Sequence, residues 1–369
     1  MRESRPIEGR PIEGRPSAAG EARDRANGTS GAAAHAGTQS ASDTVRAYRI
    51  ESDGTRVWGA LTQLSRDALS PGNLVIRSRY AGINYKDALA GTTAGKVIRK
   101  FPRVGGLEVV GQVLSSEDAR FAPGDTVIAH SMGMGVDHDG GFAEQVRVPA
   151  DWALPLPEGM SAFEAGAIGV AGYSAALSIE LLEREGMSPG AGPVLINGAT
   201  GSVASMAVGM LSGKGYEVVA LTSKREAADR LKARGAARVI VSGELEDAGR
   251  PLEKAQWAAA IDSVGGAQLS WLVRSMQNRG LIASLGNAGG NELATSVLPF
   301  ILRGVRLVGV NVMVYIDLKR HIWGRLATDL KPAALPENTR LITLDELPAR
   351  MQAMLEGRSD GRAVVDFGR

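Results

Sequence analysis

The chain contains 369 residues, of which 44% are hydrophobic, and it carries a formal net charge of +2 and no cysteine. Its length predicts two globular domains, and its near-neutral charge, without a compact block of Lys or Arg, gives no indication of a nucleic-acid partner or of binding to an acidic membrane surface. The same charge balance favours a small-molecule partner. The absence of cysteine excludes disulfides, thiolate nucleophiles and cysteine-ligated zinc, so any redox chemistry in this chain requires a bound cofactor.

The first 43 residues differ in composition from the rest. A short unit occurs at 5–10 and again at 11–15, and the chain then becomes rich in Gly, Ala, Ser and Thr up to residue 43. Such a segment buries too little apolar surface to offset its chain entropy, so 1–43 is predicted to be disordered. Its interspersed acids disfavour a transit peptide, and it has no apolar signal core. No apolar run approaches the roughly 20 residues that span a bilayer, which predicts a cytoplasmic protein.

From residue 44 the pattern is that of a folded protein. Strands at 73–78 and 109–114 are separated by Pro/Gly turns, which predicts a β-rich domain. After about Ser161, apolar strands alternate with amphipathic helices; the strands are expected at 194–196, 217–221, 238–241, 258–261 and 281–285, and the helices at 202–214, 225–234 and 267–277. This alternation predicts a parallel sheet with right-handed crossovers.

Past Leu330 the chain is expected to return to the first domain, with a last strand at 363–366. The predicted fold class is therefore α/β, a Rossmann-type doubly wound parallel sheet embedded in a β-rich catalytic domain. The catalytic domain comprises 44–165 and 331–369, and the nucleotide-binding domain comprises 166–330.

The stretch 194–207 reads VLINGATGSVASMA, a buried strand that leads through small residues into an apolar helix. At the first strand-to-helix turn of a doubly wound sheet, free N–H groups at the helix N-terminus hold a dinucleotide pyrophosphate. Gly201 allows that close approach, and Ala204 lets the helix pack on the strand. The cofactor-binding residues predicted from this turn are Thr200, Gly201, Ser202, Val203 and Ala204. A strict G-x-G-x-x-G is absent, and a tight packing corner would give the same pattern.

The end of the next strand indicates which dinucleotide is bound. NAD-binding domains usually carry an acidic residue there, about 20 residues further on, that holds the ribose 2′-hydroxyl. This chain instead has Thr222, Ser223, Lys224 and Arg225. Hydroxyls and cations suit a 2′-phosphate, so NADP(H) is predicted over NAD(H). The alternative is that Lys224 and Arg225 are solvated residues at the start of a helix, a position that cations normally disfavour.

Several short motifs together resemble the medium-chain dehydrogenase/reductase superfamily, and within it the zinc-free NADPH-dependent acrylyl-CoA reductases, which are related to quinone oxidoreductases. The resemblance runs from about Arg46 to the C-terminus and implies a GroES-like catalytic domain. Its markers are GINYKDA at 82–88, GLE at 106–108, GGFAEQ at 140–145, GATG at 198–201, AIDSVG at 260–265 and VLPFILRGV at 297–305.

The resemblance implies particular roles for residues in both domains. Tyr85 is placed near the nicotinamide as a proton donor or as the residue that positions a water, and Asn84 and Asp87 hold its loop. The alternative for Tyr85 is an aromatic packed between the domains. Further residues implied to contact the cofactor, besides Tyr85, are Ala88, Leu285, Asn287 and Arg362. Zinc-dependent members have His where this chain has Leu107, so no metal is predicted.

The activity implied by the resemblance is NADPH-dependent reduction of an activated C=C bond, with acrylyl-CoA as the first substrate. Hydride addition to the β-carbon spreads charge onto a thioester or quinone oxygen, which demands less stabilisation than an alkoxide does. The alternatives are an NADPH:quinone oxidoreductase and a non-catalytic NADPH-binding sensor or structural protein. Segment 310–316, which borders the substrate cleft in relatives, departs from their pattern at Asn311. The run 300–312 is implied to form a homodimer interface.

Overall fold

The fold is that of a computed structural model, which describes residues 44–245, 247, 249–332, 335, 339–358 and 361–369. The predicted disordered segment 1–43 lies outside the described residues.

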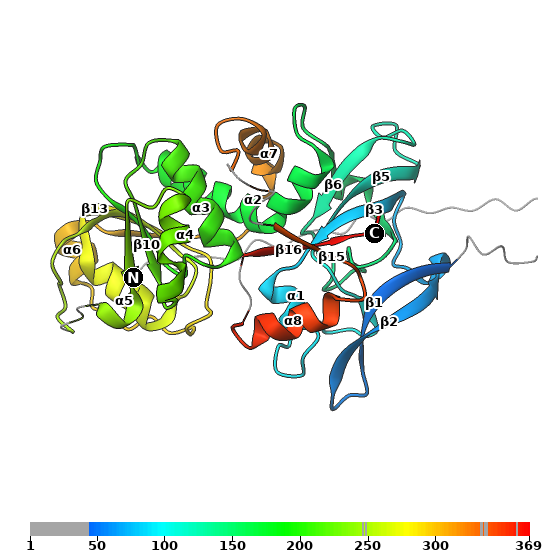
Figure 1. Ribbon diagram of the computed structural model, residues 1–369, viewed down its shortest axis with the longest axis horizontal. Coiled ribbons are helices and arrows are strands. Elements are labelled where there is room, and N and C mark those ends of the chain that lie inside the picture. The colour runs from blue at the N-terminus through cyan, green and yellow to red at the C-terminus, as the bar shows by residue number, and fades with distance from the viewer. Residues whose placement is uncertain (1–43, 246, 248, 333–334, 336–338, 359–360) are drawn as a thin grey trace, which may run out of the picture. The chain divides into compact units, whose positions relative to one another are not determined.

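The β-rich half consists of two sheets (Figure 1). A three-stranded sheet has the order β2-β1-β4, and a seven-stranded sheet has the order β15-β16-β3-β5-β6-β8, with β7 paired to β3. The last strand of the chain, β16, therefore lies beside β3, as antiparallel pairing of Val364 with Gly82 shows, and β15 pairs with β16 at the edge of the sheet. The strands are β1 (Thr44–Ser52), β2 (Val57–Ser65), β3 (Leu74–Gly82), β4 (Arg103–Val104), β5 (Glu108–Ser116), β6 (Thr126–His130), β7 (Gln145–Val148), β8 (Ala153–Pro155), β15 (Thr339–Ile342) and β16 (Arg362–Asp366).

The second half contains a six-stranded sheet in which all pairings are parallel, with the order β11-β10-β9-β12-β13-β14. The chain first adds strands on one side of β9 and then on the other, which is the doubly wound order and confirms the predicted fold class. The strands are β9 (Val194–Ile196), β10 (Val218–Thr222), β11 (Arg238–Val241), β12 (Trp257–Asp262), β13 (Met276–Ser284) and β14 (Arg306–Gly309).

Helices cover both faces of the parallel sheet because successive strand residues point to opposite sides. Val194 and Ile196 pack in one core with α2, α3 and α4, whereas Leu195 packs in another core with α5 and Phe300 of α6. The helices are α3 (Ser202–Gly213), α4 (Ala228–Ala233), α5 (Gly266–Ser275) and α6 (Leu298–Arg303). Strand β13 begins at Met276, earlier than the predicted 281.

Helix α2 (Ala162–Arg184) joins the two halves and was not predicted. It packs against β3 and β5 of the β-rich half and against α3 and β13 of the parallel-sheet half. Among the described residues it is the one helix long and apolar enough to cross a membrane, so the expectation that no such run exists was wrong. Because 89% of its apolar window is buried within the fold, its hydrophobicity is accounted for by core packing. The predicted domain boundary at 165/166 falls inside this helix and stays a prediction.

The remaining helices lie outside the central layers. They are α1 (Tyr85–Ala90), which packs on α8 (Leu347–Leu355), and α7 (Lys319–Ala327), which packs on α2. Short 3-10 turns are η1 (Arg66–Ala68), η2 (Ala150–Trp152), η3 (Arg225–Ala227), η4 (Ser242–Glu244) and η5 (Ile316–Leu318).

Candidate active site and cofactor-binding turns

Tyr85 is the first residue of α1, and its position is fixed by the residues on either side of it. The backbone N–H of Asn84 donates to Asp87 Oδ2 at 2.8 Å, which satisfies a free donor at the helix start. The N–H of Leu107, at the start of the next strand region, donates to Asp87 Oδ1 at 3.0 Å. Asp87 is only 2% exposed, whereas Tyr85 is 45% exposed. Asp87 thus positions Tyr85 without itself reaching the surface.

Burial raises the pKa of Asp87 to about 7. The largest cause is loss of water around the carboxyl group, and the nearby charge of Glu108 adds to it, whereas the hydrogen bonds from Asn84 and the charge of Arg362 oppose the shift. Asp87 therefore gains a proton near neutral pH more easily than an exposed aspartate does.

Arg362, which the resemblance places near a cofactor phosphate, lies inside the fold with 3% of its surface exposed. Its guanidinium forms an ion pair with the equally buried Glu108. It also donates to the carbonyls of Ala167 at 3.1 Å and Ile83 at 2.9 Å, and to Asn84 Oδ1 at 3.0 Å. These contacts tie the guanidinium to protein acceptors, and the expected role near a cofactor phosphate stays a prediction.

Two glycines make room for this buried ion pair. A Cβ at Gly82 would lie 1.7 Å from Arg362 Nη2, and a Cβ at Gly169 would lie 2.2 Å from the same atom. Gly169 also has a φ of 48° and interrupts α2 with a kink. At that kink the N–H of Val170 donates to Glu108 Oε2. Glu108 and Arg362 therefore connect the start of α1, the end of β3 and the break in α2.

Ala88, which the resemblance places against the cofactor, is also buried. It is 2% exposed and packs in a core with Ala90 and Ile98 on the inner side of α1, so it does not face an open site. Among the described residues of α1, only Tyr85 and the charged Lys86 are exposed.

The donors that a catalytic zinc would need are missing from this region. Leu107 supplies only its backbone to Asp87, and Glu108 is occupied by Arg362. Within the described ranges no group of three His, Asp or Glu side chains is close enough to hold a metal ion. His130 Nε2 accepts a hydrogen bond from Trp323 Nε1 at 2.9 Å inside the core. These residues do not fit a zinc ion.

The predicted pyrophosphate turn lies between β9 and α3. Gly201 caps α3 and is exposed, and a Cβ built there would meet only the Gly198 carbonyl oxygen, at 3.2 Å. Ala204 is buried under the helix, which agrees with its expected packing role. Ser202 Oγ donates to the Gly361 carbonyl at 3.2 Å, so this hydroxyl links the turn to the start of β16. Thr200 and Val203 are half-buried beside it. The open backbone fits a dinucleotide phosphate.

The end of β10 presents the residues predicted to select NADP(H). Thr222 is buried and its Oγ1 accepts from the N–H of Lys224 at 3.0 Å, so it shapes the turn. Ser223 is exposed and Lys224 is half-buried. Arg225 is exposed and forms an ion pair with Glu244 at 2.5 Å. A hydroxyl and cations at the end of this strand fit a 2′-phosphate.

A buried polar cluster joins three strands where the strand order reverses. Asp262, fully buried at the end of β12, accepts from Asn197 Nδ2 at 2.5 Å, from Ser284 Oγ at 2.8 Å and from the N–H of Gly265 at 3.0 Å. Asn197 follows β9 and Ser284 ends β13, so Asp262 fixes the carboxyl ends of all three strands. Dinucleotides bind in the crevice at this switch point. The sequence marked 260–265 only as a family motif and assigned no role to Asp262.

Two other predicted cofactor residues follow Ser284. The N–H of Leu285 donates to the carbonyl of Asp262 at 2.9 Å, so the end of β13 is tied to the same cluster. Asn287 is exposed, and its Nδ2 donates to Asn291 Oδ1 at 2.6 Å.

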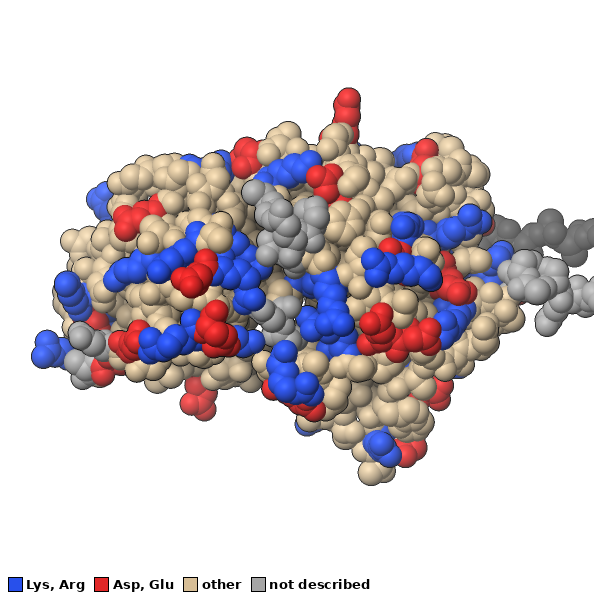
Figure 2. All heavy atoms as spheres, viewed as in Figure 1, with Lys and Arg blue, Asp and Glu red and all other residues tan. Residues whose placement is uncertain are grey.

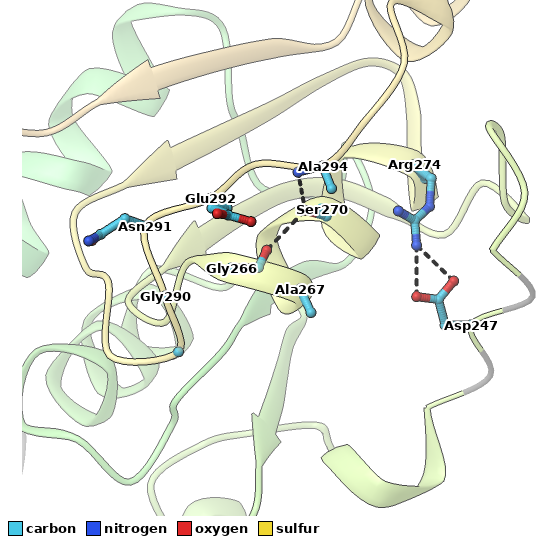
Figure 3. A pocket seen from close by; sticks show the side chains of 10 residues that line it. Asp247, Gly266, Ala267, Ser270, Arg274, Gly290, Asn291, Glu292 and Ala294 are labelled. Atoms are coloured by element: carbon cyan, nitrogen blue, oxygen red, sulfur yellow. Dashed lines mark hydrogen bonds and ion pairs between the residues drawn. The ribbon is translucent and has the colours of Figure 1, made fainter.

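A hollow of 590 Å³ lies beyond this loop, on the outer side of α5 (Figure 3). Two of its charged groups pair with each other, since Arg274 Nη2 donates to both oxygens of Asp247 at 2.7 Å, and Ser270 Oγ both donates to Gly266 and accepts from Ala294. None of the residues predicted to act in catalysis or cofactor binding lines it.

Comparison with known proteins identifies the family. The alcohol dehydrogenase GroES-like domain matches residues 70–158, and the zinc-binding dehydrogenase domain matches 202–327. The acrylyl-CoA reductase AcuI of Ruegeria pomeroyi is 39% identical over 86% of this chain and 96% of the relative. The crystal structure of Bacillus subtilis YhfP is 43% identical with a TM-score of 0.85, and that of Escherichia coli YhdH is 39% identical with a TM-score of 0.83. The matches cover 88% and 87% of this chain respectively, and 99% of each relative.

A GroES-like half and a doubly wound nucleotide-binding half define an oxidoreductase of the medium-chain dehydrogenase/reductase class. The chain belongs to the zinc-free branch of that superfamily that includes AcuI and YhfP. The cofactor prediction is confirmed at the level of the family, because YhdH was crystallised with NADPH and its Salmonella enterica counterpart with NADP. The YhfP structure contains NAD.

Proposed function

We propose that this protein reduces the activated C=C bond of an enoyl thioester with NADPH, with acrylyl-CoA as the first substrate and propionyl-CoA as its product. The observation that carries the proposal is the similarity to AcuI, at 39% identity over nearly the whole relative. The exposed Tyr85, held by a buried network at the start of α1, supports it.

The proposed roles follow from the geometry of each residue. The bound nicotinamide supplies a hydride for the β-carbon of the substrate. Tyr85, or a water that it holds, delivers the proton to the α-carbon, because its side chain faces outward with no hydrogen bond to the described part of the chain. Asn84, Asp87 and Arg362 act through Tyr85, as positioning residues.

The proposed cofactor site uses both turns of the parallel-sheet half. The open backbone at Gly201 holds the pyrophosphate, and Ser223, Lys224 and Arg225 hold the 2′-phosphate. Asp262 keeps the crevice between them in shape. Because Arg225 already pairs with Glu244, we expect Ser223 to contribute more than Arg225 to the preference for NADPH.

Quinone reduction is the second candidate, favoured by YhfP, whose name places it provisionally among the quinone oxidoreductases. The deciding experiment follows the oxidation of NADPH and NADH with acrylyl-CoA, crotonyl-CoA and a simple quinone. The proposal expects the highest kcat/KM with NADPH and acrylyl-CoA. A preference for the quinone would establish the alternative, and nucleotide binding without turnover of any acceptor would establish a sensor or structural role.

The assembly and the location of the protein are also proposed. Ile301 and Leu302 of α6 are 70% and 62% exposed, and β14 is an edge strand of the parallel sheet, so this side offers apolar surface and unpaired backbone for a second copy. Light scattering on the purified protein is expected to give the mass of a homodimer, and the mass of one chain would contradict it. A cytoplasmic location stays a prediction, which cell fractionation would test.

A further inference from the structure

A group of unpaired cations follows Tyr85 along the chain. Lys86, Lys96, Arg99 and Lys100 are all exposed. Within the described part of the chain none of them takes part in an ion pair, hydrogen bond or ring contact. Between Asp87 and Glu108 the sequence contains no acidic residue at all. On the face that Figure 2 shows, many Lys and Arg side chains lie near Asp and Glu.

The four cations are held close to Tyr85 by the way the chain turns after α1. The N–H of Thr92 donates to the Leu89 carbonyl at 3.0 Å, and a Cβ at Gly95 would lie 2.0 Å from the same oxygen, so the segment folds back on the helix. Ile98 then packs in the core beside Ala88. Lys86 directly follows Tyr85, and Leu89 is about one helical turn further along α1, so the segment that carries the other three cations returns to the helix on which Tyr85 lies.

Neighbouring acids do not neutralise these cations because they are engaged elsewhere. Asp53, in the turn before β2, accepts from the backbone of Thr55 and Arg56. Glu346 and Glu356, at the two ends of α8, bond Thr343 and Arg358. The positive charge beside Tyr85 is therefore available to a ligand.

We propose that Lys86, Lys96, Arg99 and Lys100 form a basic rim that binds the phosphate groups at the nucleotide end of a CoA thioester while its acyl end lies at Tyr85. The inference rests on the proposed function and deepens it by naming the part of the substrate that is recognised. Cations at the edge of a site raise the rate of capture of a charged substrate, and salt weakens this effect. A neutral quinone would gain nothing from the rim.

The rim is tested with the triple variant Lys96→Gln/Arg99→Gln/Lys100→Gln, which leaves Tyr85 and Lys86 intact. The control is Arg77→Gln/Lys232→Gln/Lys254→Gln, which removes the same number of exposed cations elsewhere. Free CoA is titrated into each protein saturated with NADP⁺, so that the dinucleotide site is full. We expect the rim variant to bind CoA about tenfold more weakly than the wild type and the control. Equal affinity of the three proteins for CoA would overturn the proposal that the rim binds CoA, even if the rim binds an acidic protein instead.

Turnover separates failure of the rim from failure of the proposed function. The wild type is expected to reduce acrylyl-CoA with a kcat/KM at least about tenfold above that for acryloyl-N-acetylcysteamine, which has the same thioester without phosphates, and salt should reduce this advantage. The rim variant should lose both the advantage and its salt dependence while the KM for NADPH stays unchanged. Equal reduction of both thioesters by the wild type would overturn the rim alone, whereas reduction of neither would overturn the proposed function and with it the rim.

Discussion

At the scale of single residues, the site separates one exposed reactive group from a buried set that positions it. Tyr85 faces outward, and Asp87, Asn84 and Arg362 form a continuous chain of hydrogen bonds behind it. Buried polar groups keep such a geometry because leaving any one of them unpaired costs about 1–3 kcal/mol. The arrangement therefore fixes the helix start on which Tyr85 sits.

Removing the phenol hydroxyl tests the proton role directly. Tyr85→Phe is expected to lower kcat with acrylyl-CoA by about 10²-fold, with little change in the KM for NADPH, because the ring and the helix start are retained. Steady-state kinetics with both substrates measures the effect. Full turnover by the variant would show that the proton comes from another source.

At the scale of elements, α2 is the part of the fold that both halves share. Its kink at Gly169 gives the N–H of Val170 to Glu108 and leaves room for Arg362, so the break in the helix and the buried ion pair depend on each other. A Cβ at position 169 would enter the space that the guanidinium fills.

A single methyl group should therefore disrupt this contact. Gly169→Ala is expected to destabilise the protein by about 3 kcal/mol, because it adds a side chain at positive φ and forces apart a buried ion pair. Gly209→Ala, in α3, has open space around its Cβ and should stabilise by about 0.5–1 kcal/mol. Thermal or urea unfolding compares the two variants, and an equal effect of both would refute the importance of the kink.

At the scale of the whole molecule, α7 connects the two halves through buried polar contacts. Lys319 Nζ donates to the carbonyls of His130 at 3.2 Å and Trp152 at 2.7 Å. Burial lowers the pKa of Lys319 to about 7. Burial, together with the charge of Lys319, also holds the pKa of His130 well below its usual value, and the hydrogen bond from Trp323 requires an unprotonated Nε2.

These shifts predict how stability changes with pH. Between pH 7 and about 10.5 the unfolded chain keeps a proton on Lys319 that the folded protein loses, so stability should rise with pH there, by at most about 1.4 kcal/mol per unit. Below about pH 6.5 the unfolded chain protonates His130 first, so stability should fall as pH falls.

Melting curves of the wild type and Lys319→Met between pH 7 and 9 isolate the lysine contribution. The wild type should gain more in Tm over this interval than the variant does, and the exposed Lys254→Met should behave as the wild type. Parallel curves for the wild type and Lys319→Met would mean that Lys319 stays charged in the folded protein.

Local sequence patterns were sufficient to predict the order of strands and helices in the parallel-sheet half. Alternation of apolar strands and helices predicted its order of elements, and the turn at 198–201 predicted the open helix start at Gly201. Helix α2 was not predicted because its glycines and other small residues give it no clear polar face. The helix has no such face because both halves of the fold bury it on nearly all sides. The burial of Ala88 was not predicted, because a short helix presents adjacent residues to opposite surroundings.

The sequence by itself determined the class of fold, the family and the kind of cofactor, because these depend on residue periodicity, on the lack of cysteine and on short motifs read along the chain. Only the tertiary structure decided that Arg362 pairs with Glu108, that Asp262 joins three strand ends, and that the cations after Tyr85 have no partner among the described residues. Each of these features depends on groups that are far apart in the chain but close in space. It also depends on which hydrogen-bonding and charged partners remain near a group once it is buried.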